Sequence, residues 1–354
     1  MFRRLLRWSF AWFLPAAVVA HGAFAKELFV APDGDDARDG TSRAAAFRTV
    51  QKGLDALCPG DVLTIAPGEY FESLARTGLG DLEHETVVRA EIPGTVVVRG
   101  DRPAPEFHPV AGRRFTYVAD FHASQPVVAV NEIDTLTILR RMPNADEPEF
   151  LPGTFHHDAA AGKLYVSTSD GRPAAAHRYG ASLLPTHGLY LVRPRRVVVE
   201  GLAFTGFSAL ELRHYREETG GGVWGLFLVH GTRCVVRDCC AYLNAWGIGL
   251  QSGPPGCGDN LVERCAAWGN RSAFANGDMG GITVFAARRD VVRRSTAYLN
   301  GMYGINIYGT GGAPPNYQDD GGNLPANRSL LEDCLAWGNE TADLKVKTAY
   351  EYHH

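Results

Sequence analysis

The residues best suited to acid–base chemistry are two lysines and a few aspartates in the last quarter of the chain. Lys345 and Lys347 are two positions apart in an alternating segment, so in a strand they would share one face. A like charge nearby lowers the pKa of an amine, which suits a general base. Asp278 and Asp343 each precede a short alternating segment. These four residues are the candidate catalytic set.

Paired acids suggest two further kinds of chemistry. Asp319 and Asp320 adjoin two glycines, and carboxylate and carbonyl oxygens together can hold Ca²⁺, although Asp-Gly clusters are also common in turns. A glycoside hydrolase needs two carboxyl groups about 5–9.5 Å apart. Asp278 could form such a pair across the fold with Glu217, Asp319 or Asp343, and spacing in the sequence does not choose among these partners.

A stripe of aromatic and amide side chains falls on alternate positions of several short segments. Such rings can stack on sugar faces and amides can bond hydroxyls, so the stripe predicts a surface for an extended sugar chain. The alternative is that loops cover these residues and that they pack as ordinary side chains. The candidate substrate-binding residues are Tyr190, Phe227, Gln251, Phe285, Asn306 and Tyr308.

A repeat supplies the elements that must position these residues. One ten-residue pattern occurs four times, at 235–244, 261–270, 291–300 and 330–339, and each copy is followed by a short alternating segment. The shortest intervals between these segments are 22 residues, from Gly225 to Gly247, and 23 residues, from Gly281 to Gly304. A unit of this length is too short for a four-stranded propeller blade and lacks the spacing of a leucine-rich repeat. It predicts one turn of a parallel β-helix.

Columns read down the four copies indicate stacking in register. One charged column alternates in sign, as neighbours about 4.8 Å apart prefer. The last residue of every copy is Asn, which suits a corner where side-chain amides bond from one coil to the next. A column of three cysteines and one serine predicts core packing, whereas Cys234 and Cys257 could pair across neighbouring coils. The columns are Arg237, Glu263, Arg293 and Glu332; Asn244, Asn270, Asn300 and Asn339; and Cys239, Cys265, Ser295 and Cys334.

These repeats resemble those of right-handed parallel β-helix proteins of the pectate-lyase-like superfamily, including their asparagine ladder. Residues 28–41, 47–51 and 59–70 are similar to the N-terminal segment of chondroitinase B-like proteins, in which an amphipathic helix, here about 45–57, caps the first coil. The resemblance covers about 27–100 and 183–347. It implies an all-β, single-chain solenoid with an N-terminal capping helix.

The resemblance also implies a reaction. In metal-dependent lyases of this fold, acids near Asp278 and Asp343 bind Ca²⁺, and a lysine on a nearby strand, here Lys345 or Lys347, removes a proton. The cation would neutralise a uronate carboxylate so that the adjacent carbon can lose its proton. The candidate metal ligands are Asp278, Asp319 and Asp320. The chain departs from that pattern at 245–246 and 302–303, where a second acid is missing, and it lacks the paired aspartates and Gly-His-Gly of polygalacturonase-type helices.

The ends of the chain and its middle carry separate expectations. Residues 1–25 have the arginine-rich start, short apolar run and Ala-Phe-Ala site of a signal peptide cut after Ala25, with a membrane anchor as the alternative. Residues 26–100 should form the cap and first coils, 101–182 a β-rich insert, and 183–354 the remaining coils. In the insert, 156–158 reads His-His-Asp, which is either a metal or catalytic cluster or a plain hairpin edge. The last coil has no cap after it, so we expect the chain to continue or its end to pack on a partner.

The chain has 354 residues, 45% of them hydrophobic, and a formal net charge of −4. That charge and the absence of a basic stripe argue against a nucleic-acid partner. The sequence therefore predicts a secreted or periplasmic parallel β-helix that acts on an acidic polysaccharide by β-elimination. The alternatives are a non-catalytic glycan-binding or surface protein and a glycoside hydrolase.

Overall fold

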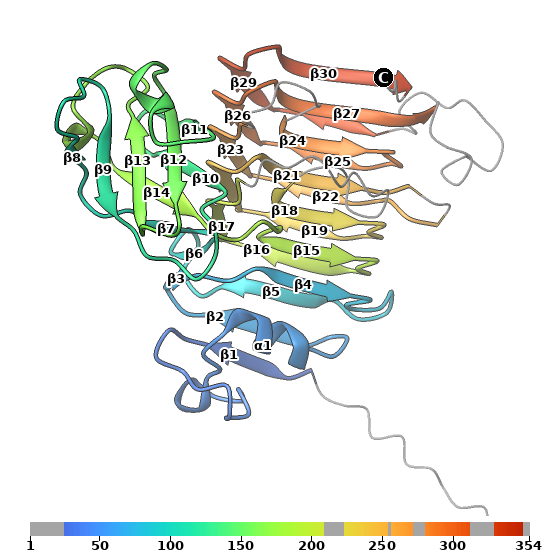
Figure 1. Ribbon diagram of the computed structural model, residues 1–354. Helices are drawn as coiled ribbons and strands as arrows, with labels where there is room; N and C mark the ends of the chain where they lie inside the picture. The colour runs from blue at the N-terminus through green and yellow to red at the C-terminus, as the bar shows by residue number, and fades with distance from the viewer. Residues whose placement is uncertain (1–24, 209–222, 254–255, 272–279, 312–328, 350–354) are drawn as a thin grey trace, which may run out of the picture.

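A computed structural model describes residues 25–208, 223–253, 256–271, 280–311 and 329–349. The chain winds into a right-handed parallel β-helix, and a second, largely antiparallel β unit lies against one side of it (Figure 1). Three parallel sheets form the walls of the helix, and each full coil adds one strand to each wall. The predicted fold class is confirmed.

The three walls are named sheets A, B and C. Sheet A contains β1 (Glu27–Val30), β2 (Val62–Ile65), β5 (Thr86–Ala90), β16 (Val197–Glu200), β19 (Val235–Arg237), β22 (Leu261–Glu263), β25 (Val291–Arg293) and β28 (Leu330–Glu332). Sheet B contains β3 (Gly68–Tyr70), β6 (Val96–Arg99), β17 (Leu202–Thr205), β20 (Cys240–Tyr242), β23 (Ala266–Trp268), β26 (Thr296–Tyr298) and β29 (Leu335–Trp337). Sheet C contains β4 (Leu74–Thr77), β15 (Leu189–Val192), β18 (Trp224–Val229), β21 (Trp246–Gln251), β24 (Gly280–Phe285), β27 (Tyr303–Gly311) and β30 (Ala342–Ala349).

Aliphatic side chains stacked in register form the core inside the coils. In sheet C, Leu226, Ile248, Ile282 and Ile305 are aligned from strand to strand, and each is fully buried. Burial of one such side chain contributes about 1.5–3 kcal/mol. The next member of the column, Leu344 in the last described coil, is 50% exposed because no described coil lies beyond it.

The asparagine column forms a continuous hydrogen-bonded ladder. Asn244 Nδ2 donates to Asn270 Oδ1 at 3.2 Å, and Asn270 Nδ2 donates to Asn300 Oδ1 at 2.9 Å. Asn300 Nδ2 in turn donates to Asn339 Oδ1 at 2.9 Å. The ladder lies against a column of glycines, where any side chain would collide: a Cβ on Gly247 would lie 2.2 Å from the carbonyl oxygen of the next coil.

The cysteine and charge columns also stack, but no disulfide forms. Cys265 N donates to Ser295 Oγ at 3.1 Å, which places these two members of the column in adjacent coils. The ion pair of Arg293 with Glu263, at 2.8 Å, is one contact of the alternating charge column. All seven cysteines are free thiols, so the suggested pairing of Cys234 with Cys257 is wrong.

A helix lies in the predicted N-terminal region but is shorter than expected. α1 covers Val50–Ala56, and Arg43–Ala45 forms a single 3₁₀ turn before it. Thr49 caps the helix by accepting a hydrogen bond from Lys52 N at 3.3 Å. α1 lies beside the first coils of the β-helix (Figure 1). Its role as a cap stays a prediction.

The second β unit is one eight-stranded sheet between the early and later coils. It begins at Asp101 and ends at Ser182, the range in which the sequence loses its coil rhythm. Its strands are β7 (Asp101–Pro103), β8 (His108–Pro109), β9 (Tyr117–Asp120), β10 (Ala129–Glu132), β11 (Thr137–Arg141), β12 (Thr154–Asp158), β13 (Lys163–Ser167) and β14 (Tyr179–Ser182). Two 3₁₀ turns, Glu147–Glu149 and Ala174–Ala176, complete it. The insert lies beside sheet B (Figure 1), where Ser208 Oγ donates to Asn131 Oδ1 at 3.2 Å.

The His-His-Asp motif lies in β12, which pairs with β13 as a hairpin. Its three side chains make separate contacts: His156 with the carbonyl oxygen of Met142 at 3.0 Å, His157 with Val127 N at 3.2 Å, and Asp158 with Ala161 N at 2.9 Å. The motif therefore has the contacts of a hairpin edge. Within the described ranges, no helix is long and apolar enough to cross a bilayer.

Candidate functional site

The candidate site is the outer face of sheet C. The connections that enter sheet C from sheet B include 206–223 and 269–279, and those that leave it for sheet A include 252–260 and 312–329. All four are longer than a short turn, and they join sheet C at the ends of its strands. Loops placed on a rigid scaffold in this way commonly carry function.

Strand register arranges the predicted residues of this face in two columns: Gln251 and Phe285 are aligned in one of them, and the other begins at Tyr190. The aligned positions run from Tyr190 through Phe227, Gly249, Thr283 and Asn306 to Lys345. Tyr308 is aligned with Lys347 in the same way. The backbone thus brings both lysines beside the predicted substrate-binding positions. The side chains of Tyr308, Lys345 and Lys347 lie outside the described part, as do Asp278, Asp319 and Asp320 entirely.

The side chains on this face point away from the coil interior, as alternation predicts, but most of them are buried. Phe227 and Asn306 have no exposed surface, and Phe285 retains 7%. Those three side chains offer a sugar little or no surface, which agrees with the alternative that these residues pack as ordinary side chains. Tyr190 and Gln251 are partly exposed.

An aromatic cluster accounts for this burial. The Trp224 ring stacks on Phe227 with centroids 4.9 Å apart and meets Trp246 edge-on at 4.3 Å. Tyr190 extends the cluster toward solvent, and its ring stacks on His187 at 4.7 Å. Burial lowers the pKa of His187 to about 4, and its Nδ1 accepts a hydrogen bond from Trp224 N at 3.0 Å. A histidine in that state is neutral at physiological pH and its Nδ1 is already occupied.

Polar groups on this face are few. Thr283 Oγ1 donates to Asn306 Oδ1, and both residues are fully buried. Among the described members of the two outward columns there is no carboxylate. No group of three or more His, Cys, Asp or Glu suited to a metal is found among the residues that the structure describes.

Asp343 accepts hydrogen bonds from Asn339 of the asparagine ladder. It occupies the position that is Gly304 in the preceding coil, and its Oδ1 accepts from Asn339 Nδ2 at 2.8 Å and from Asn339 N at 3.1 Å. A Cβ on Gly304 would lie 2.4 Å from the Asp343 carbonyl oxygen, so a side chain at Gly304 would collide with the coil that contains Asp343. This contact gives Asp343 a structural task; its predicted catalytic role stays a prediction.

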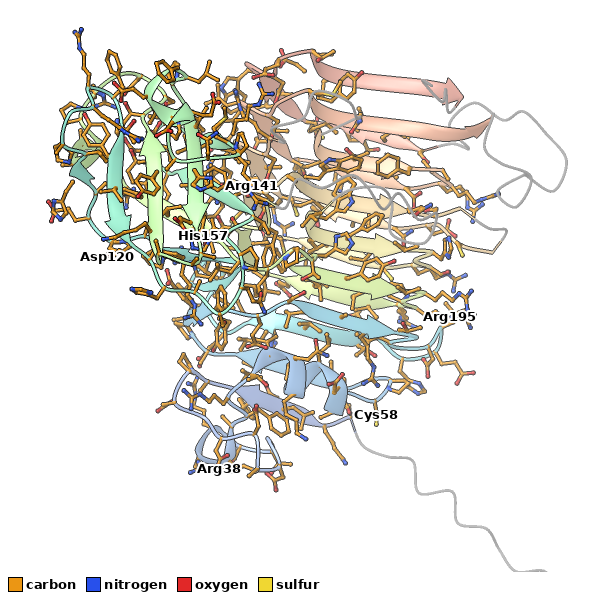
Figure 2. The ribbon with its side chains drawn as sticks, in the orientation of Figure 1. Arg38, Cys58, Asp120, Arg141, His157 and Arg195 are labelled. Atoms are coloured by element: carbon orange, nitrogen blue, oxygen red, sulfur yellow. The ribbon has the colours of Figure 1, made fainter. Side chains whose placement is uncertain are left out.

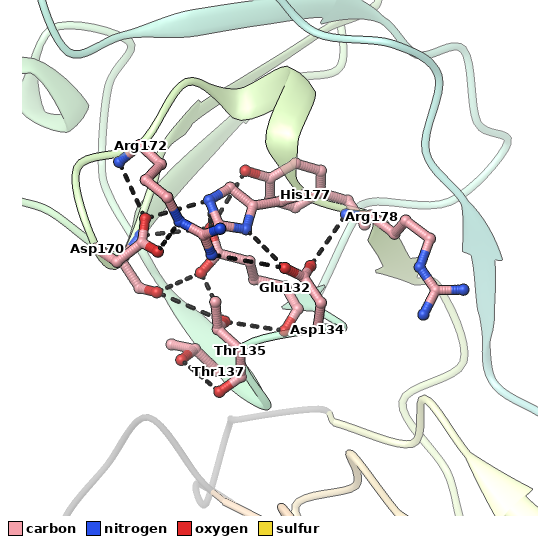
Figure 3. A network of polar contacts seen from close by, with 10 residues as sticks. Glu132, Asp134, Thr135, Thr137, Asp170, Arg172, His177 and Arg178 are labelled. Carbon is pink, nitrogen blue, oxygen red and sulfur yellow. Dashed lines mark hydrogen bonds and ion pairs between the residues drawn. The ribbon is translucent and has the colours of Figure 1, made fainter.

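The insert contains a polar network that sequence reasoning missed (Figure 3). The His177 side chain is fully buried, with Nδ1 2.9 Å from Asp134 Oδ2 and Nε2 3.1 Å from Asp170 Oδ1. The Tyr179 hydroxyl donates to Glu132 Oε1 at 3.2 Å. Of these residues, His177 and Tyr179 border a pocket of 440 Å³, which Arg178 also lines. Since both His177 ring nitrogens already face carboxylates, the network ties the insert together.

An aromatic ladder, separate from the cluster on sheet C, runs along the outside of sheet B. Tyr242, Trp268, Tyr298 and Trp337 stack with centroids 4.6–5.7 Å apart and planes within 6° of parallel. They hold one position of the ten-residue repeat, and that recurrence was the available signal. Because each ring covers its neighbour's face, mainly ring edges are left for other contacts, so this ladder is a poor sugar platform.

Comparisons with known proteins agree on the fold. The chain matches a solved structure described as the complex of XylC with xylose, with a TM-score of 0.54 and 11% identity; the match covers 80% of this chain and 60% of that one. Other matches are a glycoside hydrolase (TM-score 0.49, 11% identity, 80% of this chain and 79% of that one) and pectate lyase Pel9A (TM-score 0.45, 14% identity, 81% and 52%). No protein-family model matches the sequence, and no curated protein matches it.

Proposed function

We propose that the chain is an exported, carbohydrate-active β-helix protein that acts on an acidic polysaccharide by β-elimination. The observation that carries the proposal is the register of sheet C, which aligns Lys345 with Asn306 and Lys347 with Tyr308 on one outward face. A like charge near an amine lowers its pKa, and for this reason the two lysines are the candidate general bases.

In the proposed reaction, Lys345 is the base and the chain's polar groups orient the sugar. The proton leaves the carbon next to the uronate carboxylate and moves to the lysine amine. The electron pair of that C–H bond forms the new carbon–carbon double bond. The glycosidic oxygen leaves with its bonding pair and takes a proton from solvent, which yields an unsaturated sugar end.

The proposal includes Ca²⁺, with Asp278, Asp319 and Asp320 as its candidate ligands. Within the described ranges no cluster of acids fits the ion, and Asp343 is occupied by the asparagine ladder. We therefore derive no step through a cation. Comparing activity with added Ca²⁺ and with a chelator tests the requirement directly.

Glycan binding without catalysis is the second candidate, and it rests on the partly exposed Tyr190 and Gln251 of this face. The described outward columns contain a threonine, amides and aromatic rings but no carboxylate. A hydrolase needs two carboxyl groups across its substrate, so the described part of this face supports hydrolysis least.

The deciding experiment is a screen of uronate-containing polysaccharides, with and without Ca²⁺, that follows ultraviolet absorbance of the unsaturated product. We expect Lys345→Gln to reduce the rate by about 10²-fold or more, the usual contribution of a general base. The matched control is Lys163→Gln, which removes a lysine paired with Asp120 on the insert and should leave the rate unchanged. Measurable binding with no product from any acidic glycan would overturn elimination and leave the binding protein.

A further inference from the structure

A group of arginines gathers where sheet C passes into sheet A. Arg193, Arg195 and Arg196 join β15 to β16, and Arg233 lies in the equivalent connection of the next coil, between β18 and β19. We call these four residues the basic corner. Figure 2 shows Arg195 at the ends of the strands, on the side of the β-helix away from the labelled insert residues.

Backbone geometry places these arginines in register. Arg196 and Arg233 have the same left-handed conformation, with φ of 50° and 53°, and Asp259 follows at 58° in the next coil. Arg196 N donates to the carbonyl oxygen of Thr232 at 2.9 Å, and Arg195 is bridged to Thr232. The two coils are therefore adjacent, with backbones about 4.8 Å apart.

The charge of the corner is only partly compensated. Arg196 Nη1 donates to the Glu83 carbonyl oxygen at 2.9 Å, and Arg289 first and then Arg233 lower the pKa of Asp259. The guanidinium groups of Arg193, Arg195 and Arg233 are exposed and make no hydrogen bond or ion pair with any residue that the structure describes. Asp259, the nearest acid of the column, is held by Arg289 through two contacts of 2.7 and 2.8 Å. Like charges on neighbouring rungs repel each other, so the corner would be stabilised by an anion.

The charge of the corner affects a neighbouring histidine. Burial and then the nearby positive charge of Arg193 lower the pKa of His230, which follows β18 as Arg193 follows β15. The corner also continues the candidate site: Tyr190, the partly exposed end of the aromatic cluster, lies three residues before Arg193. At the rise of a β-strand that is about 10 Å.

We propose that the basic corner binds the carboxylate groups of an acidic polysaccharide whose chain continues over Tyr190. The planar fork of a guanidinium matches a carboxylate through two hydrogen bonds. Arginines repeated on adjacent coils suit carboxylates repeated along a polyuronate. The choice of a carbohydrate as the ligand rests on the proposed function; the position of the site rests on the arginines alone.

The test measures binding of polygalacturonate to the full chain and to the double variant Arg195→Gln/Arg233→Gln by titration calorimetry at two salt concentrations. Neither side chain has a described partner, so the variant should fold normally, which circular dichroism checks. We expect binding to weaken about tenfold or more, because two charge-assisted contacts are lost. The matched control is Arg48→Gln, an exposed arginine with no described side-chain partner near the N-terminal end, and it should bind like the wild type.

The outcomes separate this inference from the proposed function. Equal binding by the wild type and the double variant would overturn the basic corner and leave the proposed function intact. Failure of the wild type to bind any acidic glycan would overturn both. Equally tight binding of a sulfated glycan or of double-stranded DNA would overturn the assignment to carboxylates. A selective loss of polygalacturonate binding in the double variant alone supports it.

Discussion

Replacing Asn270 by alanine should destabilise the β-helix far more than the same change at Asn339. Asn270 is 1% exposed and occupies the middle of the asparagine ladder. Its Oδ1 accepts from Asn244 N and Asn244 Nδ2 at 3.2 Å each, and its Nδ2 donates to Ala241 O and Asn300 Oδ1 at 2.9 Å each.

The magnitude follows from the groups that lose partners. The Asn270→Ala change leaves the Asn244 amide and the Ala241 carbonyl oxygen without these bonds, in a place that water does not reach. A stranded buried polar group costs about 1–3 kcal/mol. We therefore expect a loss of about 3–5 kcal/mol in the free energy of unfolding. Asn339→Ala removes the corresponding bonds to the Asn300 amide and the Ala297 carbonyl oxygen. Because Asn339 itself is half-buried, water can enter the vacated site and replace part of these bonds, so we expect a smaller loss of about 1–2 kcal/mol.

Urea unfolding of the wild type and both variants measures the difference, with tryptophan fluorescence and circular dichroism recorded on the same samples. Coincident curves from the two probes show that unfolding is two-state and that a single free energy describes it. Solenoid proteins do not always meet this condition. Equal losses for the two variants, or a loss under about 1 kcal/mol for Asn270→Ala, would refute the assignment of coil-to-coil cohesion to the ladder.

Three further outcomes are expected. Gly247→Ala should abolish soluble expression or cost about 3 kcal/mol or more, because its Cβ would lie 2.2 Å from a backbone oxygen; unfolding curves check this, and wild-type stability would contradict it. Hydrogen bonds from the backbone and then the side chain of Arg172 lower the pKa of Asp170 to about 2. The stabilisation is therefore full above about pH 4, the pKa of an unfolded aspartate, and disappears as the pH falls toward 2; Asp170→Asn should flatten that acid limb in pH-dependent melting. If a signal peptidase cleaves the chain after Ala25, N-terminal sequencing of the exported protein should begin at Lys26. The backbone nitrogen of Lys26, which lies 2.8 Å from Asp61 Oδ1, would then be a charged amino group. Asp61→Asn should then lower the melting temperature of the exported protein.

Periodicity explains which parts of the fold were predictable. The ten-residue repeat predicted the coil, the strand register and the asparagine ladder, because residues at one repeat position must stack once the chain winds regularly. The same reasoning was available for the aromatic ladder that contains Trp268 and Trp337, since it also recurs at a single repeat position. It was not available for Asp343, because the aligned position of the preceding coil is Gly304 and the repeat contains no acid there.

The sequence by itself determined which side chains face inward and which outward, since alternation along a strand is a local property. Whether an outward side chain meets solvent is decided by what packs over it, which is why Phe227 and Asn306 are buried on an outward face. The insert's network required distant segments to meet around His177. The basic corner likewise exists only because one turn of the β-helix brings Arg233 beside Arg195 and Arg196, residues nearly forty positions earlier in the chain.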